Sequence, residues 1–183
     1  MTGLFGGAFD PPHLGHVALL EEARRHFVLE RIVVLVVVDP GHKGVHAGAS
    51  DRLALAVAAF PGYEVELDCH ARTIDLLRAR AYPDPLFLIG ADEFADFLDW
   101  KEPDAVLELA RLGVATRPGF SREQFEAVLA QLARPEGIVF FEMRPAEVSS
   151  SKVRERVSRG ESIEGLVPPA VEQAITDARL YRS

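Results

Sequence analysis

The chain of 183 residues has a single cysteine, Cys69, so an internal disulfide is excluded and a reducing compartment is indicated. Its longest apolar run, Ile32 to Val38, is far too short to span a bilayer. The first residues lack the basic, apolar and small-residue order of a secretory signal, so none is expected. We therefore expect a cytoplasmic protein with no membrane partner.

Positive charge is also scarce. The chain has 20 lysine and arginine residues against 28 aspartate and glutamate residues, which gives a formal net charge of −8. This balance argues against a general nucleic-acid binder, because such proteins usually carry a basic face. A small anionic ligand stays compatible, since a few basic groups and a metal ion can reverse the field inside one cleft.

Short apolar runs alternate with longer helical patterns along the whole chain. Runs typical of buried strands occur near the start and at residues 32–38, 63–67, 86–89, 112–115 and 138–141. A strand followed by a helix, repeated, predicts an α/β fold: a Rossmann-like, doubly wound parallel sheet with helices on both faces. No break in composition divides the chain, so we expect one domain over residues 1–183, with a small C-terminal helical appendage.

Capping residues predict where three of the helices begin. The Ser50-Asp51 pair can cap a helix that follows it. A serine and a glutamine three residues apart form a candidate capping box for a helix from residue 121 through Leu132. Two prolines at 168–169 open a last helix predicted over residues 170–180.

One glycine- and histidine-rich stretch, residues 6–16, joins the first predicted strand to the first predicted helix. Gly6 and Gly7 allow a ligand close to the backbone, because neither has a Cβ. His13 and His16 are three residues apart where the helix begins, so both rings can face one way. The helix N-terminus there suits a phosphate. The stretch is neither a P-loop nor a G-x-G-x-x-G fingerprint, and two solvated histidines are the plainer interpretation of H-x-x-H alone.

Three more polar clusters follow predicted strands, at residues 40–43, 90–92 and 117–119. Because the carboxyl ends of parallel strands share one edge of a sheet, we expect these clusters to converge with residues 6–16. Lys43 offers a mobile positive charge for phosphate. Asp92 can accept a hydrogen bond from a sugar hydroxyl or support a metal-bound water. A solvated loop lysine and a helix-capping aspartate are the alternatives.

Two further segments carry candidate ligand contacts. Trp100, the only tryptophan, can stack on a base or pyridine ring, although core packing is the commoner use of such a residue. A helix is predicted over residues 149–157, with Ser150 and Ser151 in its serine-rich start and Arg154 one turn further on. Their hydroxyl, N–H and guanidinium groups fit phosphate oxygens. A capped surface helix with a solvated arginine accounts for the same residues.

Taken in order, these motifs resemble the bacterial nicotinate-nucleotide adenylyltransferase family, part of the nucleotidyltransferase superfamily with an H-x-G-H motif. The similar segments are G-G-x-F-D-P-x-H-x-G-H at 6–16, P-x-H-K at 40–43, G-A-D with W-K between 90 and 101, R-P-G at 117–119, S-S-x-x-V-R at 149–154 and G-L-V-P at 165–168. The resemblance covers almost the whole chain.

The chain also departs from the family pattern. Ala8 stands where serine or threonine is usual, and Gly41 replaces one proline of a P-P-H-K loop. Arg72 replaces the tyrosine of an S-Y-T-x-D-T segment, in which Thr73 and Asp75 are kept. Because that segment is expected to touch the pyridine nucleotide, Arg72 bears on the choice of substrate.

The resemblance implies transfer of the adenylyl group of ATP to nicotinate mononucleotide, with deamido-NAD and pyrophosphate as products. It places His16 on the α-phosphate and His13 beside it on the triphosphate, with Lys43 and Arg154 on β- and γ-oxygens as the other catalytic residues. The implied ATP contacts are Gly6, Gly7, Ala8, Phe9, His13, His16, Gly90, Asp92, Arg117, Ser150, Ser151 and Arg154. The implied contacts of the pyridine nucleotide are Lys43, Thr73, Asp92 and Trp100. Mg²⁺ would be held mainly by phosphates and water, without protein ligands.

Three alternatives remain compatible with parts of the sequence. A sister transferase acting on phosphopantetheine, glycerol phosphate or another phosphate would share the motif. The Trp100 segment and residues 149–154 favour the pyridine nucleotide over it, and the Arg72 change weakens that preference. A non-catalytic nucleotide sensor would keep the cleft, but the retained histidines and basic residues argue against it. A zinc site built from His13, His16, Cys69 and His70 lacks a known ligand spacing.

Overall fold

The computed structural model describes residues 1–41, 44–117, 119, 121–144 and 146–182. Within these residues six strands form one sheet in the order β3-β2-β1-β4-β5-β6, and every neighbouring pair is parallel. The strands are β1 Thr2–Gly7, β2 Arg31–Val37, β3 Glu64–Asp68, β4 Pro85–Gly90, β5 Arg111–Thr116 and β6 Ile138–Glu142. The predicted doubly wound parallel sheet is therefore confirmed.

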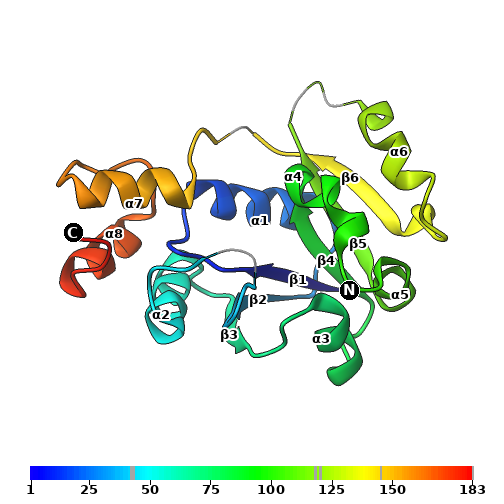
Figure 1. Ribbon diagram of the computed structural model, residues 1–183, viewed down its shortest axis with the longest axis horizontal. Helices are drawn as coiled ribbons and strands as arrows, with labels where there is room; N and C mark the ends of the chain where they lie inside the picture. The colour runs from blue at the N-terminus through cyan, green and yellow to red at the C-terminus, as the bar shows by residue number, and fades with distance from the viewer. Residues whose placement is uncertain (42–43, 118, 120, 145, 183) are drawn as a thin grey trace.

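Helices cover the sheet on both sides (Figure 1). They are α1 Leu14–His26, α2 Ala49–Ala59, α3 Thr73–Ala79, α4 Ala91–Ala95, α5 Pro103–Leu109, α6 Glu126–Leu129, α7 Ser150–Ser158 and α8 Pro169–Asp177, with 3-10 turns at Phe97–Asp99, Arg122–Phe125 and Pro135–Gly137. Across the described residues, no helix has the length and apolar character needed to cross a membrane.

Alternation along the central strands builds two cores. Phe5 and Val34 belong to the core beneath α1, α2, α7 and α8, whereas Leu4 and Val33 belong to the core beneath α3, α4, α5 and α6. Successive side chains of a strand point to opposite faces, so an unbroken apolar run is what a strand needs when both faces are covered. The C-terminal helices add Val171 to the first of these cores.

The strand order reverses between β1 and β4. From β1 the chain builds outward through β2 and β3, then crosses back to place β4, β5 and β6 on the other side of β1. Such a reversal leaves a crevice outside the carboxyl ends of the strands, where open α/β sheets bind ligands. The strand arrows in Figure 1 point toward the side of the molecule where α1 begins.

Three helix boundaries differ from the sequence prediction. α2 begins at Ala49 with Gly48 in the capping position, so the Ser50-Asp51 pair lies inside the helix. The segment predicted as one helix from residue 121 is a 3-10 turn followed by the short α6. Phe125 at the junction packs edge-on against Phe94, 5.1 Å between ring centroids, so tertiary packing overrides the local helical pattern. α8 ends at Asp177, before two left-handed residues.

Candidate active site

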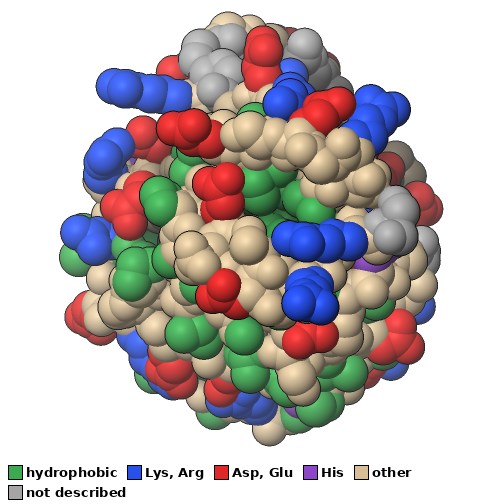
Figure 2. Space-filling model, turned by 90° about the vertical axis from the view of Figure 1, so that its left-hand side faces the viewer, with side chains coloured by type: hydrophobic (Ala, Val, Ile, Leu, Met, Phe, Trp, Pro, Cys, Tyr) green, Lys and Arg blue, Asp and Glu red, His purple; other side chains and the backbone are tan. Residues whose placement is uncertain are grey.

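A cavity of about 660 Å³ lies at the carboxyl ends of the central strands. The predicted site residues that line it are Gly6, Gly7, Ala8, Phe9, His13, His16, Thr73, Gly90, Asp92, Trp100, Arg117 and Ser150. Lys43 lies outside the described residues, and Ser151 and Arg154 do not line the cavity. Figure 2 shows the molecule from the side toward which the strands point, with hydrophobic side chains in a hollow and basic and acidic side chains around it.

His13 and His16 form a stacked pair at the start of α1. Their ring centroids are 3.6 Å apart and the ring planes differ by 23°. The backbone N–H of His13 donates to Nδ1 of His16 over 3.1 Å. Since Nδ1 is the acceptor, a neutral His16 ring carries its proton on Nε2. The backbone therefore selects the tautomer of His16.

The glycine between the two histidines is required by the stacking. A Cβ at Gly15 would lie 3.0 Å from both Cε1 and Nδ1 of His13, closer than a real Cβ contact normally comes. Any side chain there would push the His13 ring away from its place over the backbone. The H-x-G-H pattern is thus a packing requirement as well as a chemical one.

Burial keeps His13 neutral. Desolvation lowers the pKa of His13 to about 4, because the charged ring would lose its hydration in this position. Its Nδ1 is buried and, in the part of the chain that the structure describes, has no hydrogen-bond partner. At neutral pH the free protein therefore presents an uncharged imidazole next to His16.

Phe9 supports His16 from behind. Its ring is only 2% exposed and packs edge-on against His16, with 5.2 Å between ring centroids, and against Phe60. The residue has a left-handed backbone, with φ of 49°, which costs free energy for a residue with a bulky side chain. Phe9 was predicted to contact ATP. Because its ring is packed against His16 and Phe60, any such contact would have to come from its backbone.

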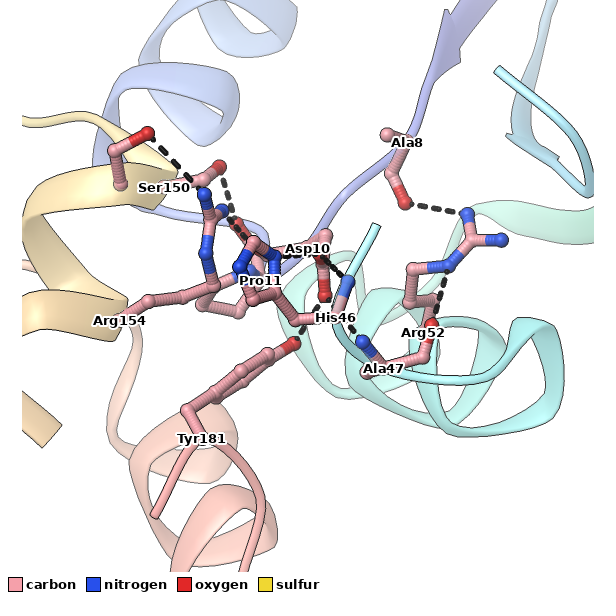
Figure 3. Close-up of polar contacts among 10 residues, drawn as sticks. Ala8, Asp10, Pro11, His46, Ala47, Arg52, Ser150, Arg154 and Tyr181 are labelled. Atoms are coloured by element: carbon pink, nitrogen blue, oxygen red, sulfur yellow. Dashed lines mark hydrogen bonds and ion pairs between the residues drawn. The ribbon is translucent and has the colours of Figure 1, made fainter. Parts of the chain in front are cut away.

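Two buried charged residues tie the site loops together (Figure 3). The Asp10 carboxylate accepts the backbone N–H groups of His46 and Ala47 over 2.7 and 3.1 Å. Arg52, 1% exposed, donates to the backbone carbonyls of Ala8 after β1, of Val37 at the end of β2, and of Val38 and Ala47 in the loop after β2. Neither role is predictable from the local sequence. Only the F-D-P part of the motif pointed to Asp10, and no local signal marked Arg52.

The residues of α7 that were predicted to bind phosphate contact the turn at Asp10 and Pro11, just before the histidine pair. Arg154 donates from Nη1 to the carbonyl of Asp10 over 2.7 Å, and Ser150 donates to the carbonyl of Pro11 over 2.9 Å. Ser151 accepts a hydrogen bond of 3.3 Å from Nη2 of Arg154. These contacts fasten the start of α7 to the turn that precedes the histidine pair.

Trp100 and His70 line the cavity, as Thr73 does. Trp100 packs edge-on against Phe87 and Phe97, with ring centroids 6.2 and 5.2 Å apart, and it also lines the cavity. His70 also lines the cavity, and its Nδ1 lies 2.8 Å from the buried carboxylate of Asp68. No sequence signal had pointed to this histidine–aspartate pair.

Asp92 and Arg117 complete the wall at the ends of β4 and β5. Asp92 lies in the first turn of α4, and Gly90, not Asp92, occupies the capping position of that helix. Arg117 directly follows β5 and its side chain is exposed. In the described residues no three His, Cys, Asp or Glu side chains meet in a group that could hold a metal ion.

Comparison with known proteins agrees with this geometry. The cytidylyltransferase-like family matches residues 4–156. A protein of Rubrobacter xylanophilus named "Probable nicotinate-nucleotide adenylyltransferase" is 35% identical, over 100% of this chain and 92% of its own length. A protein of the same name from Thermus thermophilus is 38% identical over 98% of both chains. The chain belongs to the nicotinate-nucleotide adenylyltransferase family.

Solved structures share the fold of this nucleotidyltransferase. The Plasmodium falciparum nicotinic acid mononucleotide adenylyltransferase complexed with NaAD matches with a TM-score of 0.75 at 16% identity, over 98% of this chain and 96% of that one. A structure named "Putative Nicotinate-nucleotide Adenylyltransferase from Vibrio parahaemolyticus" matches with a TM-score of 0.66 at 21% identity, over 100% of this chain and 95% of that one.

Two departures from the family pattern meet in space. Arg72, in place of the family's tyrosine, lines the cavity next to Thr73. Its Nη1 lies 3.2 Å from the point that a Cβ of Gly41 would occupy, and Gly41 stands where the family has a proline. The two departures are therefore neighbours, and Arg72 is the one that lines the cavity.

Proposed function

We propose that the protein transfers the adenylyl group of ATP to nicotinate mononucleotide and forms deamido-NAD and pyrophosphate. An oxygen of the mononucleotide phosphate bonds to the α-phosphorus of ATP, and the bond from that phosphorus to the bridging oxygen of the β-phosphate breaks. The stacked His13–His16 pair, on a cavity that Thr73 and Trp100 also line, is the observation that carries the proposal. The attacking phosphate is already an anion, so the site needs to position charge rather than abstract a proton.

His16 would act on the α-phosphate. With Nδ1 occupied by the N–H of His13, its Nε2–H is the donor that can meet a non-bridging oxygen as negative charge grows there. The N-terminus of α1, a helix of 13 residues, adds a positive dipole end and free N–H groups at the same place. His13, neutral in the free protein, would lie against the triphosphate, whose negative charge raises the proton affinity of a nearby imidazole.

The rest of the triphosphate would be held by basic groups and backbone. Arg154 uses one hydrogen of Nη1 on Asp10 and one of Nη2 on Ser151, so each nitrogen keeps a second N–H for β- and γ-oxygens. We propose Lys43 and Arg117 as further cationic contacts, with Ser150 and Ser151 at the start of α7. Backbone groups at Gly6, Gly7, Ala8, Phe9 and Gly90 would complete the ATP site.

The pyridine nucleotide would lie near Thr73 and Trp100. The exposed part of the Trp100 indole offers a face for the pyridine ring, and the Thr73 hydroxyl offers a polar partner for its edge. Asp92 would accept from a ribose hydroxyl or from water on a bound metal ion. We propose Lys43 as a contact of the mononucleotide phosphate as well.

A divalent metal ion, Mg²⁺ in our proposal, would arrive with ATP. The donor set fits this mode, because the carboxylates that line the cavity, among them Asp92, are too dispersed to form a cage by themselves. Mg²⁺ keeps several waters and is commonly bound through substrate phosphates and one or two carboxylates. When bound it supplies charge neutralisation on the phosphates.

One hydrophobic core is shared by the first and last parts of the chain, which supports a single domain. Phe5 of the first strand and Ile175 of the last helix lie in the same hydrophobic cluster, so we infer that residues 1–183 form a single nucleotidyltransferase domain. Cys69 is an exposed free thiol, which suits a reducing cytoplasm.

Pyrophosphate release tests the function directly. The purified chain, ATP and Mg²⁺ are incubated separately with nicotinate mononucleotide, with its amide and with phosphopantetheine. We expect release with the acid mononucleotide and formation of deamido-NAD, seen by mass. Product with phosphopantetheine alone would contradict the pyridine assignment, and no product with any acceptor would support a nucleotide sensor.

A further inference from the structure

The carboxylate of Asp10 receives a hydrogen bond from the opposite end of the chain. The hydroxyl of Tyr181 donates to Oδ1 of Asp10 over 2.8 Å, across 171 residues of sequence (Figure 3). Asp10 is 4% exposed, its carboxylate accepts the backbone N–H groups of His46 and Ala47, and Nδ1 of the exposed His46 ring lies 3.5 Å from Oδ2. Tyr181 therefore supplies the side-chain hydrogen bond that satisfies this buried charge.

The backbone after α8 turns back and places the Tyr181 hydroxyl next to Asp10. After α8, Arg179 and Tyr181 have left-handed backbones, with φ of 51° and 61°, and Leu180 donates its N–H to the carbonyl of Ile175 over 3.1 Å. Non-glycine residues rarely adopt this conformation, so the surrounding packing stabilises it. Burial and the neighbouring Asp10 raise the pKa of the Tyr181 hydroxyl, so it keeps its proton and remains a donor.

Asp10 connects the two loops between which the phosphates would bind. Three residues before His13, it holds through its carboxylate the segment that leads into α2 and through its carbonyl the guanidinium of Arg154. The cation Arg52 makes the complementary link, from Ala47 back to Ala8 and the end of β2. A shift of Asp10 would therefore move the His13–His16 turn relative to both α7 and the β2–α2 loop.

We propose that Tyr181 is a positioning residue for the transferase reaction, an inference that rests on the function proposed above. Its hydroxyl holds Asp10, and Asp10 sets the histidine turn against the segment before α2. Tyr181 would then act on the reaction through Asp10 and not through a contact with substrate. A displacement of about 1 Å at a reacting group can lower a rate about a hundredfold, so one hydrogen bond in this position is enough to affect turnover.

Replacement of the hydroxyl alone tests the proposal. Tyr181→Phe keeps the ring that packs against the core and removes only the donor. Tyr63→Phe is the matched control: its hydroxyl donates to Glu21 over 2.7 Å and accepts from Arg24 over 3.3 Å, at the amino ends of the strands. For Tyr181→Phe we expect kcat to fall about tenfold, with less than a twofold change in KM for the mononucleotide. For Tyr63→Phe we expect kcat within twofold of the unchanged chain.

A double-mutant cycle separates positioning from general loosening. We expect Asp10→Ala, which removes the acceptor oxygens, to lower kcat in its own right. The proposal requires that adding Tyr181→Phe to it causes less than a twofold further loss, because both changes break the same hydrogen bond. Full additivity of the two effects, or an equal loss of kcat in Tyr63→Phe, would overturn the positioning role. So would a Tyr181→Phe protein with unchanged kcat.

A readout without turnover keeps this inference distinct from the proposed function. The amides of His46 and Ala47 are held by Asp10, so we expect their hydrogen exchange to quicken severalfold in Tyr181→Phe and to stay unchanged in Tyr63→Phe. If the unchanged chain forms no product with any acceptor, the function has failed and the exchange rates still decide whether Tyr181 orders the site. Unchanged exchange in Tyr181→Phe would reject the role.

Discussion

The guanidinium of Arg72 rests on Gly41, with Nη1 3.2 Å from the position of the absent Cβ. Gly41 has a φ of +64°, a left-handed conformation that proline cannot adopt because its ring holds φ near −65°. A proline at this position, as in the family pattern, would thus change the loop and crowd Arg72. Gly41 and Arg72 are therefore coupled, and a change at one affects the room for the other.

The position of Arg72 predicts a preference for the acid form of the mononucleotide. Its positive charge lies beside Thr73 and favours a nicotinate carboxylate over the neutral amide. An exposed charge pair contributes roughly 0.2–1 kcal/mol, so we expect Arg72→Gln to raise KM for the acid about two- to fivefold and to leave the amide nearly unaffected. Arg78→Gln, which removes an exposed charge paired with Glu102, is the control. An equal change for acid and amide would argue against this contact.

Loss of the His16 ring should affect chemistry more than folding. Removal of one donor to a developing oxyanion costs about 2.7–4 kcal/mol, so we expect His16→Ala to lower kcat about a hundredfold or more. Far-ultraviolet circular dichroism should stay unchanged. His26→Ala, at the other end of the same helix, should keep kcat within twofold. Near-normal turnover of His16→Ala would remove His16 from the mechanism.

Gly15→Ala tests the stacking of the histidine pair. Glycine to alanine in an exposed helix usually adds stability, because alanine has the better helix propensity. Here the new Cβ would meet the His13 ring at 3.0 Å, so we expect kcat to fall about tenfold as the ring moves. Gly137→Ala, where the new Cβ meets only a Leu107 methyl at 3.7 Å, should keep full activity. Equal kinetics for the two variants would contradict the packing argument.

The buried His13 makes the protein sensitive to acid. Its pKa is about 4 in the folded chain and near 6.5 when unfolded, so between these pH values the unfolded state binds more protons. The free energy of unfolding should therefore fall as the pH drops from 6.5 toward 4, by roughly 2–3 kcal/mol from this group. Urea unfolding at several pH values measures the slope, and His13→Gln should flatten it. The same slope in both proteins would show that other groups cause the acid sensitivity.

Loss of the buried Arg52 should lower the free energy of unfolding far more than loss of a solvent-exposed arginine. Arg52→Met would leave the carbonyls of Ala8, Val37 and Val38 without their buried donor, at about 1–3 kcal/mol for each unsatisfied group. We expect at least about 3 kcal/mol of lost stability by urea unfolding. Arg31→Met, which breaks an exposed pair with Glu64, should cost about 1 kcal/mol or less. Similar losses in both would contradict the bracing role of Arg52.

The sequence by itself determined the architecture and the location of the cleft. An unbroken apolar run such as Ile32–Val38 is typical of a strand that is covered on both faces, and the run can be read directly from the local sequence. The glycines and histidines of residues 6–16 are likewise close together in the sequence, so their arrangement at the start of α1 depends mainly on local backbone conformation. Parallel topology then brings separate polar clusters to one edge, which is why most of the predicted site residues line one cavity.

Contacts between distant residues were decided only by the tertiary structure. Nothing local to Tyr181 reveals that its hydroxyl reaches Asp10, nor that Arg52 reaches back to Ala8, 44 residues earlier. The neutral state of His13 depends on burial by other elements, which no local pattern contains. The break before α6 has the same origin, since aromatic packing of Phe125 outweighs helix propensity. Local sequence patterns therefore predicted which residues form the site, and long-range packing determined how their side chains are oriented and that His13 is neutral.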